Sequence, residues 1–230
     1  MHHLLEMLRN RDAAGVARGI RDQAMRTRVS VGLQRDLRSE APIPCARIPI
    51  EVRTASGAEI LALLSSTGGP SSWHERRELA IRESHASQCL GQGFVAQEPA
   101  SRRICFIQWV LRAEDNTRIR SFFKGRFPPL MRDEALFENA YTPPDFRGLG
   151  IMPAAMGRIC EIVRSQGARL GITFVDHLNE ASLRGCRKAG FVPYLIRRDY
   201  SFCGGLVHRR VFSPLTYLSP FSPFQPQNPQ

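Results

Sequence analysis

The sequence predicts a mixed α/β domain in which one mostly antiparallel sheet carries helices on both faces. Between residues 47 and 141, short apolar and β-branched runs alternate with Pro and Gly breaks, which is typical of strands. After residue 141 the pattern changes to helix, strand, helix and strand. Antiparallel strands followed by such a segment give a mixed sheet with helices packed on its faces.

The predicted strands share one pattern, a short apolar run between breaking residues. In chain order they are residues 48–54, 89–97, 104–112, 136–141, 170–175, 191–196 and 206–212. A basic loop, residues 118–126, joins the third to the fourth.

Four helices are predicted between these strands, at residues 58–65, 71–87, 153–166 and 180–189. Ser71 and Asn179 are suited to cap the second and fourth helices, because their side chains accept a hydrogen bond from a free backbone N–H. Gly167 and Gly190 end the third and fourth, since glycine adopts the left-handed conformation found after helices.

The chain is predicted to consist of a lead-in, residues 1–46, a domain, residues 47–212, and a tail, residues 213–230. Val16, Ile20 and Ala24 recur at spacing four and predict a helix over roughly the first 28 residues. That helix packs beside the domain or lies on a membrane surface. The tail is proline-rich and uncharged, which predicts disorder, with docking through its apolar residues as the alternative.

The composition excludes several classes of protein. Of the 230 residues, 43% are hydrophobic and 23% are charged, which is close to the globular average and excludes wholesale disorder. No apolar run is long enough to cross a membrane, and the N-terminus lacks the core of a signal peptide. The six cysteines are scattered, without C-x-x-C spacing, so we expect reduced thiols, no metal site and a cytoplasmic protein.

The charge is strongly positive, with 32 Lys and Arg against 21 Asp and Glu and a net charge of +11. Almost all of the basic residues are arginine. Such an excess indicates an anionic partner: nucleic acid, an acidic membrane or a phosphate-bearing ligand.

The segment Tyr141-Thr142-Pro143-Pro144-Asp145-Phe146-Arg147-Gly148-Leu149-Gly150-Ile151-Met152-Pro153 joins a strand directly to a helix. Its two glycines permit a tight turn. The free N–H groups and the dipole at a helix start attract an anion. The loop is therefore predicted to bind phosphate through its backbone. It differs from a Rossmann fingerprint, which needs a third Gly, and from a P-loop, which needs Gly-Lys-Ser/Thr.

About thirty residues later the chain reads Asn179-Glu180-Ala181-Ser182-Leu183-Arg184-Gly185-Cys186-Arg187-Lys188-Ala189-Gly190-Phe191. With both motifs in place, the sequence resembles the GCN5-related N-acetyltransferase (GNAT) superfamily. That family has Arg/Gln-x-x-Gly-x-Gly/Ala after its fourth strand and Asn-x-x-Ser/Ala…Lys-x-Gly-Phe after its fifth. The resemblance covers roughly residues 47–212 and is strongest over 136–196.

The resemblance implies a sheet splayed between its fourth and fifth strands and an N-acetyltransferase that uses acetyl-CoA or another acyl-CoA. It implies that Tyr141 and Thr142 hydrogen-bond the pantetheine arm and that Asn179 contacts the cosubstrate or positions the loop. The amides implied to bind the pyrophosphate are those of Arg147, Gly148, Leu149, Gly150, Ile151 and Met152. The partners implied are an acyl-CoA and an amine acceptor, and a homodimer is left open. Met152 departs from the family, which usually has Gly or Ala there.

The catalytic groups are predicted less directly. Many family members place a Tyr where this chain has Cys186, which is interpreted either as a thiol proton donor or as a small core residue. Glu138 is the preferred general base, and Glu134, on the same strand face, is a second candidate. His177 is a further candidate for the base.

Two other functions stay open beside the enzyme. A non-catalytic acyl-CoA-binding protein agrees with the replacement of Tyr by Cys186. A nucleic-acid-associated protein agrees with the arginine excess but lacks a helix-turn-helix signature and an aromatic–basic strand face. We therefore expect nucleic acid not to be a partner.

Overall fold

The computed structural model describes residues 25–40, 42–66, 73–202 and 207–215, which form two compact units. The larger unit consists of residues 33–193. The smaller unit combines the residues before Leu33 with those from Tyr194 onward. Strands β1 (Met25–Asp36) and β7 (Val192–Phe202) each contribute residues to both units. The predicted domain limits at 46/47 and 212/213 stay predictions.

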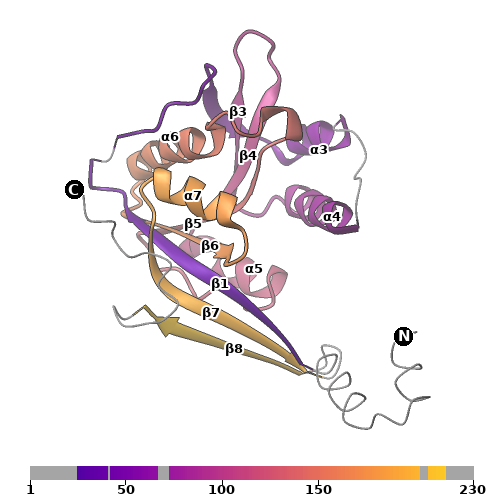
Figure 1. Ribbon diagram of the computed structural model, residues 1–230, viewed down its shortest axis with the longest axis vertical. Helices are drawn as coiled ribbons and strands as arrows, with labels where there is room; N and C mark the ends of the chain where they lie inside the picture. The colour runs from indigo at the N-terminus through magenta and orange to yellow at the C-terminus, as the bar shows by residue number, and fades with distance from the viewer. Residues whose placement is uncertain (1–24, 41, 67–72, 203–206, 216–230) are drawn as a thin grey trace. The chain divides into compact units, whose positions relative to one another are not determined.

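A mixed sheet forms the centre of the larger unit (Figure 1). Four antiparallel strands lie side by side in chain order: β2 (Glu51–Ala55), β3 (Gln92–Gln97), β4 (Ile104–Leu111) and β5 (Glu134–Tyr141). Strand β6 (Leu170–Asp176) then pairs with β5 in parallel. The end of β1 lies beyond β6, where the Leu37 N–H donates to the Arg169 carbonyl at 2.9 Å. The prediction of a mixed, mostly antiparallel sheet is confirmed.

Helices cover both faces of this sheet. Helices α3 (Gly57–Ser66) and α4 (Trp73–Ser87) lie on one side of the strands, and α6 (Ile151–Ser165) and α7 (Glu180–Lys188) lie on the other (Figure 1). The buried ring of Trp109 on β4 stacks on His85 of α4, with ring centroids 4.6 Å apart. Helix α6 buries a continuous apolar face that includes Met156 and Ile159. The four predicted helices are thus present, although Ser71 lies outside the described residues.

In the smaller unit, β7 and β8 (Val207–Pro214) form an antiparallel pair that runs from Leu195 opposite Pro214 to Phe202 opposite Val207. The first part of β1 contributes Ser30, whose hydroxyl accepts a hydrogen bond from the buried Arg197 guanidinium at 2.9 Å. Strand β8 therefore takes in the first two residues of the predicted tail, and residues 216–230 lie outside the described residues.

Strand β1 was not predicted. The helix predicted over roughly residues 1–28 is wrong at its end, since residues 25–28 belong to this strand, and its earlier part lies outside the described residues. Thr27, Val29, Val31 and Leu33 alternate with other residues, so a period-two pattern follows the period-four pattern at once. Because the two patterns meet without a Pro or Gly break, the boundary carries no local signal.

The predicted basic loop at 118–126 is also wrong in its first half, because residues 116–122 form helix α5 (Asn116–Phe122). A 3₁₀ turn, Ala113–Asp115, precedes it. Ile119 is 2% exposed and anchors the helix, and the Asn116 side chain exchanges two hydrogen bonds with the backbone of Leu130, at 2.8 and 2.9 Å. The basic residues of this segment favoured an exposed loop, because its one buried residue, Ile119, shows no periodic apolar pattern.

The described cysteines are all free thiols, as predicted. Cys105, Cys160 and Cys186 are buried, and Cys45 and Cys89 are exposed. Among the described helices, none combines the length and the apolar character that crossing a bilayer requires.

Candidate functional site

Strands β5 and β6 part soon after they meet. Their parallel pairing covers Glu134 opposite Leu170, Ala135 opposite Gly171 and Leu136 opposite Ile172. Beyond these pairs both strands continue, β5 to Tyr141 and β6 to Asp176, without further pairing between them. The two strand ends therefore present backbone groups that the sheet does not use.

A β-bulge in β5 lies where the strands part. On β4, Gln108 stands opposite two residues of β5, Asn139 and Ala140, because Ile107 faces Tyr141 and Trp109 faces Glu138. Asn139 adopts a left-handed backbone, with φ of 58°, which costs most residues energy but is tolerated by Asn. A bulge of this kind bends the strand and increases its twist.

The bulge decides which side chains share a face of the sheet. Residues directly opposite in an antiparallel pair lie on the same face, so Glu138 shares the face of Trp109, and Tyr141 shares the face of Ile107. Ile107 and Trp109 alternate on one strand and thus lie on one face. Glu138 and Tyr141, three residues apart, therefore both lie on the face covered by α4.

Two complementary polar atoms at the bulge have no hydrogen-bond partner among the described residues. They are the Gln108 Oε1, an acceptor, and the Asn139 Nδ2, a donor. The Gln108 side chain is 1% exposed. Because buried polar groups are nearly always paired, these two atoms are exceptions within the part of the chain that the structure describes.

The loop after β5 turns sharply into helix α6. Pro144–Phe146 form one 3₁₀ turn, after which Gly148 and Gly150 adopt left-handed backbones with φ of 78° and 72°. The Arg147 Nε donates to the Thr142 carbonyl at 3.2 Å, which ties the two ends of the turn together. The glycines are required here because other residues rarely adopt this backbone.

Within the described residues, none of the backbone amides from Gly148 to Met152 donates to a backbone or side-chain acceptor. The Arg147 amide, which was predicted to belong to the same set, donates to the Pro144 carbonyl at 3.1 Å. The open amides lead into and begin a 15-residue helix, whose dipole places partial positive charge at this end. The loop thus offers an anion both free backbone N–H donors and the positive electrostatic potential of a helix N-terminus.

The segment before β2 contacts the loop through the backbone of Cys45 and Arg47. The Arg47 N–H donates to the Leu149 carbonyl at 2.8 Å. A Cβ atom at Gly150 would come within 3.4 Å of the Cys45 carbonyl oxygen. The loop backbone is therefore held in place on the side opposite its open amides.

Met152, the departure from the family pattern, packs against helix α7. A Cβ atom at Gly185 would approach the Met152 sulfur to 2.9 Å, so the Met152 side chain lies directly over this glycine and would have to shift for any larger residue. The side chain is directed into the contact between α6 and α7, and the Met152 amide stays open.

Arg82 of α4 is a site residue that the sequence did not reveal. Its guanidinium lies over the ring of Tyr141, 4.4 Å from the ring centroid, and its side chain is only 12% exposed. Burial lowers the pKa of Arg82, and Arg147 lowers it further. Its ion pair with Glu78 is long, 3.4 Å. Helix α4 carries many charged residues, and nothing in their spacing distinguishes Arg82.

The two predicted catalytic side chains lie on different elements. Glu138 is half-buried on β5 and shares the face of α4. Cys186 lies on α7 and is 1% exposed. Burial raises the pKa of its thiol to about 12, so the group stays protonated at neutral pH. This burial favours the second interpretation of Cys186, that of a small core residue.

The remaining predicted residues are exposed. The Asn179 side chain accepts from the Ser182 N–H at 3.1 Å, which confirms it as the cap of α7, while its contact with a cosubstrate stays a prediction. The His177 ring lies 3.5 Å from the Asp176 carboxylate. Arg184, also in the second motif, forms an ion pair with Glu180 at 3.0 Å.

The site has three features: β5 and β6 part, a glycine turn follows, and the amides at the start of α6 are open. These are the features expected of the GNAT fold, which the two sequence motifs predicted. No family model matches the sequence, and no curated protein matches it. Solved structures do match. A GCN5-related N-acetyltransferase from Sphaerobacter thermophilus aligns with a TM-score of 0.50 and 16% identity, over 89% of this chain and 57% of that chain.

Two further structures align similarly. A conserved protein of unknown function from Staphylococcus epidermidis has a TM-score of 0.50 and 14% identity, over 81% of this chain and 65% of that chain. The glucosamine N-acetyltransferase region of a fungal multi-domain β-N-acetylglucosaminidase has a TM-score of 0.54 and 13% identity, over 81% of this chain and 22% of that chain. The chain thus spans less than two thirds of each of these proteins. It has the GNAT fold.

Proposed function

We propose that the protein is an acyl-CoA-dependent N-acyltransferase that transfers an acetyl group from acetyl-CoA to an amine. One observation carries the proposal: β5 leaves β6 and leads directly into a turn whose amides, from Gly148 to Met152, are open at the start of α6. The GNAT fold supports it, since several proteins of that fold are acetyltransferases.

The residues present fit the cosubstrate. The amides of Gly148 to Met152 would hold its pyrophosphate, and the exposed Arg147 would add positive charge there. The backbone at Tyr141 and Thr142, where β5 no longer pairs with β6, would hydrogen-bond the pantetheine arm. Acetyl-CoA supplies an acyl group activated as a thioester.

The chain's own contribution to the chemistry is to remove a proton. Attack by an amine requires its neutral form and a base that accepts the proton. Glu138 is our proposed base, because it shares the α4 face with Tyr141 and stands at the bulge. Arg82 adds a poorly compensated positive charge to that face, which lowers the proton affinity of amines bound nearby.

Thermal unfolding with acetyl-CoA tests the binding step. At a ligand concentration of about 100 Kd, binding to the native state stabilises it by about 2.7 kcal/mol. For a chain of this size the midpoint rises by about 5–10 °C. Absence of any shift with acetyl-CoA and with longer acyl-CoAs would contradict the proposal.

A non-catalytic acyl-CoA-binding protein is the second candidate. Cys186 favours it, because the position where many family members have a proton-donating Tyr is occupied here by a buried thiol. Release of free thiol from acetyl-CoA across a panel of amines separates the two. The enzyme releases thiol with at least one amine, whereas the binding protein shows the thermal shift alone. We also propose a cytoplasmic location, which the free thiols support.

A further inference from the structure

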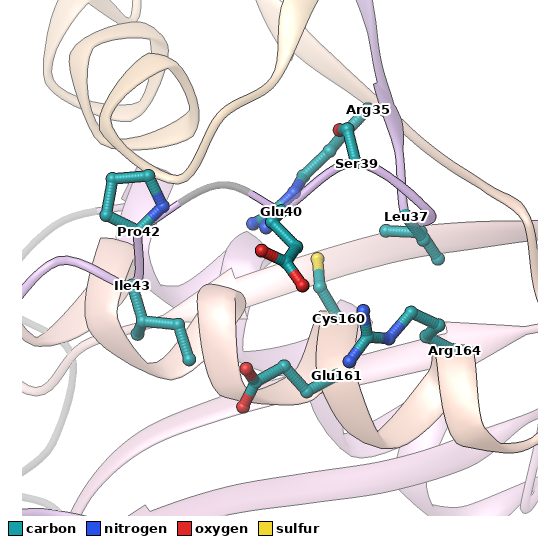
Figure 2. A pocket seen from close by; sticks show the side chains of 9 residues that line it. All are labelled: Arg35, Leu37, Ser39, Glu40, Pro42, Ile43, Cys160, Glu161 and Arg164. Atoms are coloured by element: carbon teal, nitrogen blue, oxygen red, sulfur yellow. The ribbon is translucent and has the colours of Figure 1, made fainter.

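A cavity open to solvent lies in the larger unit, away from the loop after β5. It has a volume of about 520 Å³ and is lined by the end of β1, the segment after it and α6 (Figure 2). Its lining includes Cys160, which lies nine residues beyond the start of α6 and therefore roughly 14 Å from the open amides. The proposed acyl transfer uses none of the lining residues.

A buried cation lies at this cavity. Arg35 is 6% exposed, and its Nη1 donates to the Ala189 carbonyl at 2.6 Å. Its Nε has no partner, and it forms no ion pair with a carboxylate, among the residues that the structure describes. An arginine stays charged at any physiological pH. A buried charge without a counter-charge is costly, so an anionic group that enters the cavity is stabilised there.

The mouth of the cavity has the opposite charge. Glu40 and Glu161 are exposed and belong to different elements, the segment after β1 and helix α6. In Figure 2 the Glu40 carboxylate lies beside the Cys160 side chain, and the Glu161 carboxylate extends toward the side of Ile43. Arg164, also exposed, follows one turn later on α6. The four charged lining groups sum to zero, which matches a ligand that carries both charges and is neutral overall.

The rest of the lining is largely apolar. Pro42 and Ile43 lie together on one side of the cavity, and Leu37 lies on the other side (Figure 2). Ligand sites combine such apolar walls with a few polar groups that fix orientation, and this volume suits a small metabolite.

We propose that this cavity binds a free aliphatic α-amino acid, with its carboxylate at Arg35, its ammonium group at Glu40 and Glu161, and its side chain against Pro42 and Ile43. A simple carboxylate adds a net negative charge to a lining whose four charged groups sum to zero, and a simple amine leaves Arg35 without a counter-charge. Only a ligand with both groups compensates the buried cation and the acidic mouth together.

Isothermal titration calorimetry of the full chain, without acetyl-CoA, tests the proposal with L-leucine. Two matched probes each lack one charge: 4-methylpentanoate lacks the amine, and 3-methylbutylamine lacks the carboxylate. L-leucine is expected to bind at least about tenfold more tightly than either. No heat with L-leucine up to about 10 mM, or equal binding of 4-methylpentanoate, overturns the proposal.

Variants locate the binding. Glu40→Gln with Glu161→Gln removes the acidic mouth at exposed positions, so the fold is retained, and the Kd for L-leucine should rise about tenfold. The matched control, Glu51→Gln with Glu114→Gln, changes exposed glutamates elsewhere and should leave the Kd within about twofold. Arg35→Met should abolish binding.

The thermal shift with acetyl-CoA is measured for each variant. An unchanged shift shows that the loop after β5 is intact, so loss of L-leucine binding is then assigned to the cavity. Unchanged binding of L-leucine in the Glu40→Gln, Glu161→Gln protein means that it binds elsewhere, and the proposal is wrong. Failure of acetyl-CoA to bind the wild type overturns the proposed function and leaves this inference standing.

Discussion

The guanidinium of Arg82 lies over the ring of Tyr141, 4.4 Å from its centroid, at the point where β5 ends and the loop begins. The contact joins helix α4 to the strand that parts from the sheet. Cation–π contacts of this kind contribute about 0.5–2 kcal/mol, with the larger values at desolvated sites.

A double-mutant cycle with Arg82→Met and Tyr141→Leu measures this contact. We expect a coupling energy of about 1 kcal/mol in urea unfolding, because the guanidinium is largely buried. The matched pair is Arg103→Met with Phe146→Leu, whose contact at 4.8 Å involves an arginine that is 58% exposed, and a smaller coupling is expected there. Equal couplings would show that burial of Arg82 does not strengthen the contact.

Gly150→Val is expected to abolish the thermal shift with acetyl-CoA. The substitution forces a β-branched residue into a left-handed backbone and places its Cβ against the Cys45 carbonyl, so the loop must change its conformation. Gly167→Val is the control, since Gly167 also has positive φ but lies at the other end of α6 with open space around it. A normal shift in Gly150→Val would mean that acetyl-CoA binds elsewhere.

Glu138→Gln is expected to lower kcat by about 10²–10⁴-fold if this carboxylate is the base. Binding of acetyl-CoA should be unchanged, because the loop amides are untouched. Glu134→Gln is the matched control on the same strand; its carboxylate accepts from the Met131 N–H at 2.8 Å and should serve structure alone. A greater loss of kcat in Glu134→Gln than in Glu138→Gln would reverse the assignment.

Cys186→Ala is expected to leave kcat/KM within about threefold, since a buried thiol with a pKa near 12 is a core residue at neutral pH. Stability should fall by about 1 kcal/mol through the loss of buried sulfur. If kcat instead falls by about a hundredfold and Cys186→Ser restores it, the side chain is the proton donor.

His85 predicts a loss of stability in mild acid. Burial lowers its pKa to about 4 from an ordinary value of 6.5, so the unfolded chain binds the proton first as the pH falls. The neutral His85 ring therefore contributes about 3 kcal/mol to the free energy of unfolding. This contribution is complete above pH 6.5 and is lost as the pH falls from about 6.5 to 4. Urea unfolding at several pH values should show a smaller loss in His85→Phe than in the wild type. His177→Gln, at an exposed ring, should behave as the wild type.

The sequence predicted most of the sheet and the site loop because their signals are local. Gly148, Gly150 and the cap at Asn179 follow from the few conformations that these residues permit, and the structure contains them as expected. Features that depend on partners far along the chain were not predictable. Strand β1 is defined by its neighbours in the folded protein, and Arg82 reaches Tyr141 only once α4 is docked.

The bulge is likewise absent from the sequence pattern. Periodicity alone places Glu138 and Tyr141 on opposite faces, since they are three residues apart. Only the register with Gln108, which faces two residues, shows that they share a face. A one-residue irregularity in a strand has no compositional signature beyond the tolerance of Asn139 for a left-handed backbone.

Deletion of Ala140 would show what the bulge contributes. Without this residue Asn139 stands opposite Gln108, β5 regains a regular pleat, and Tyr141 stays opposite Ile107 on the face of Arg82. What the strand loses is the left-handed residue and the local bend and twist that a bulge adds. The extra residue therefore sets the direction in which β5 leaves the sheet, and the faces of its side chains are the same with or without it.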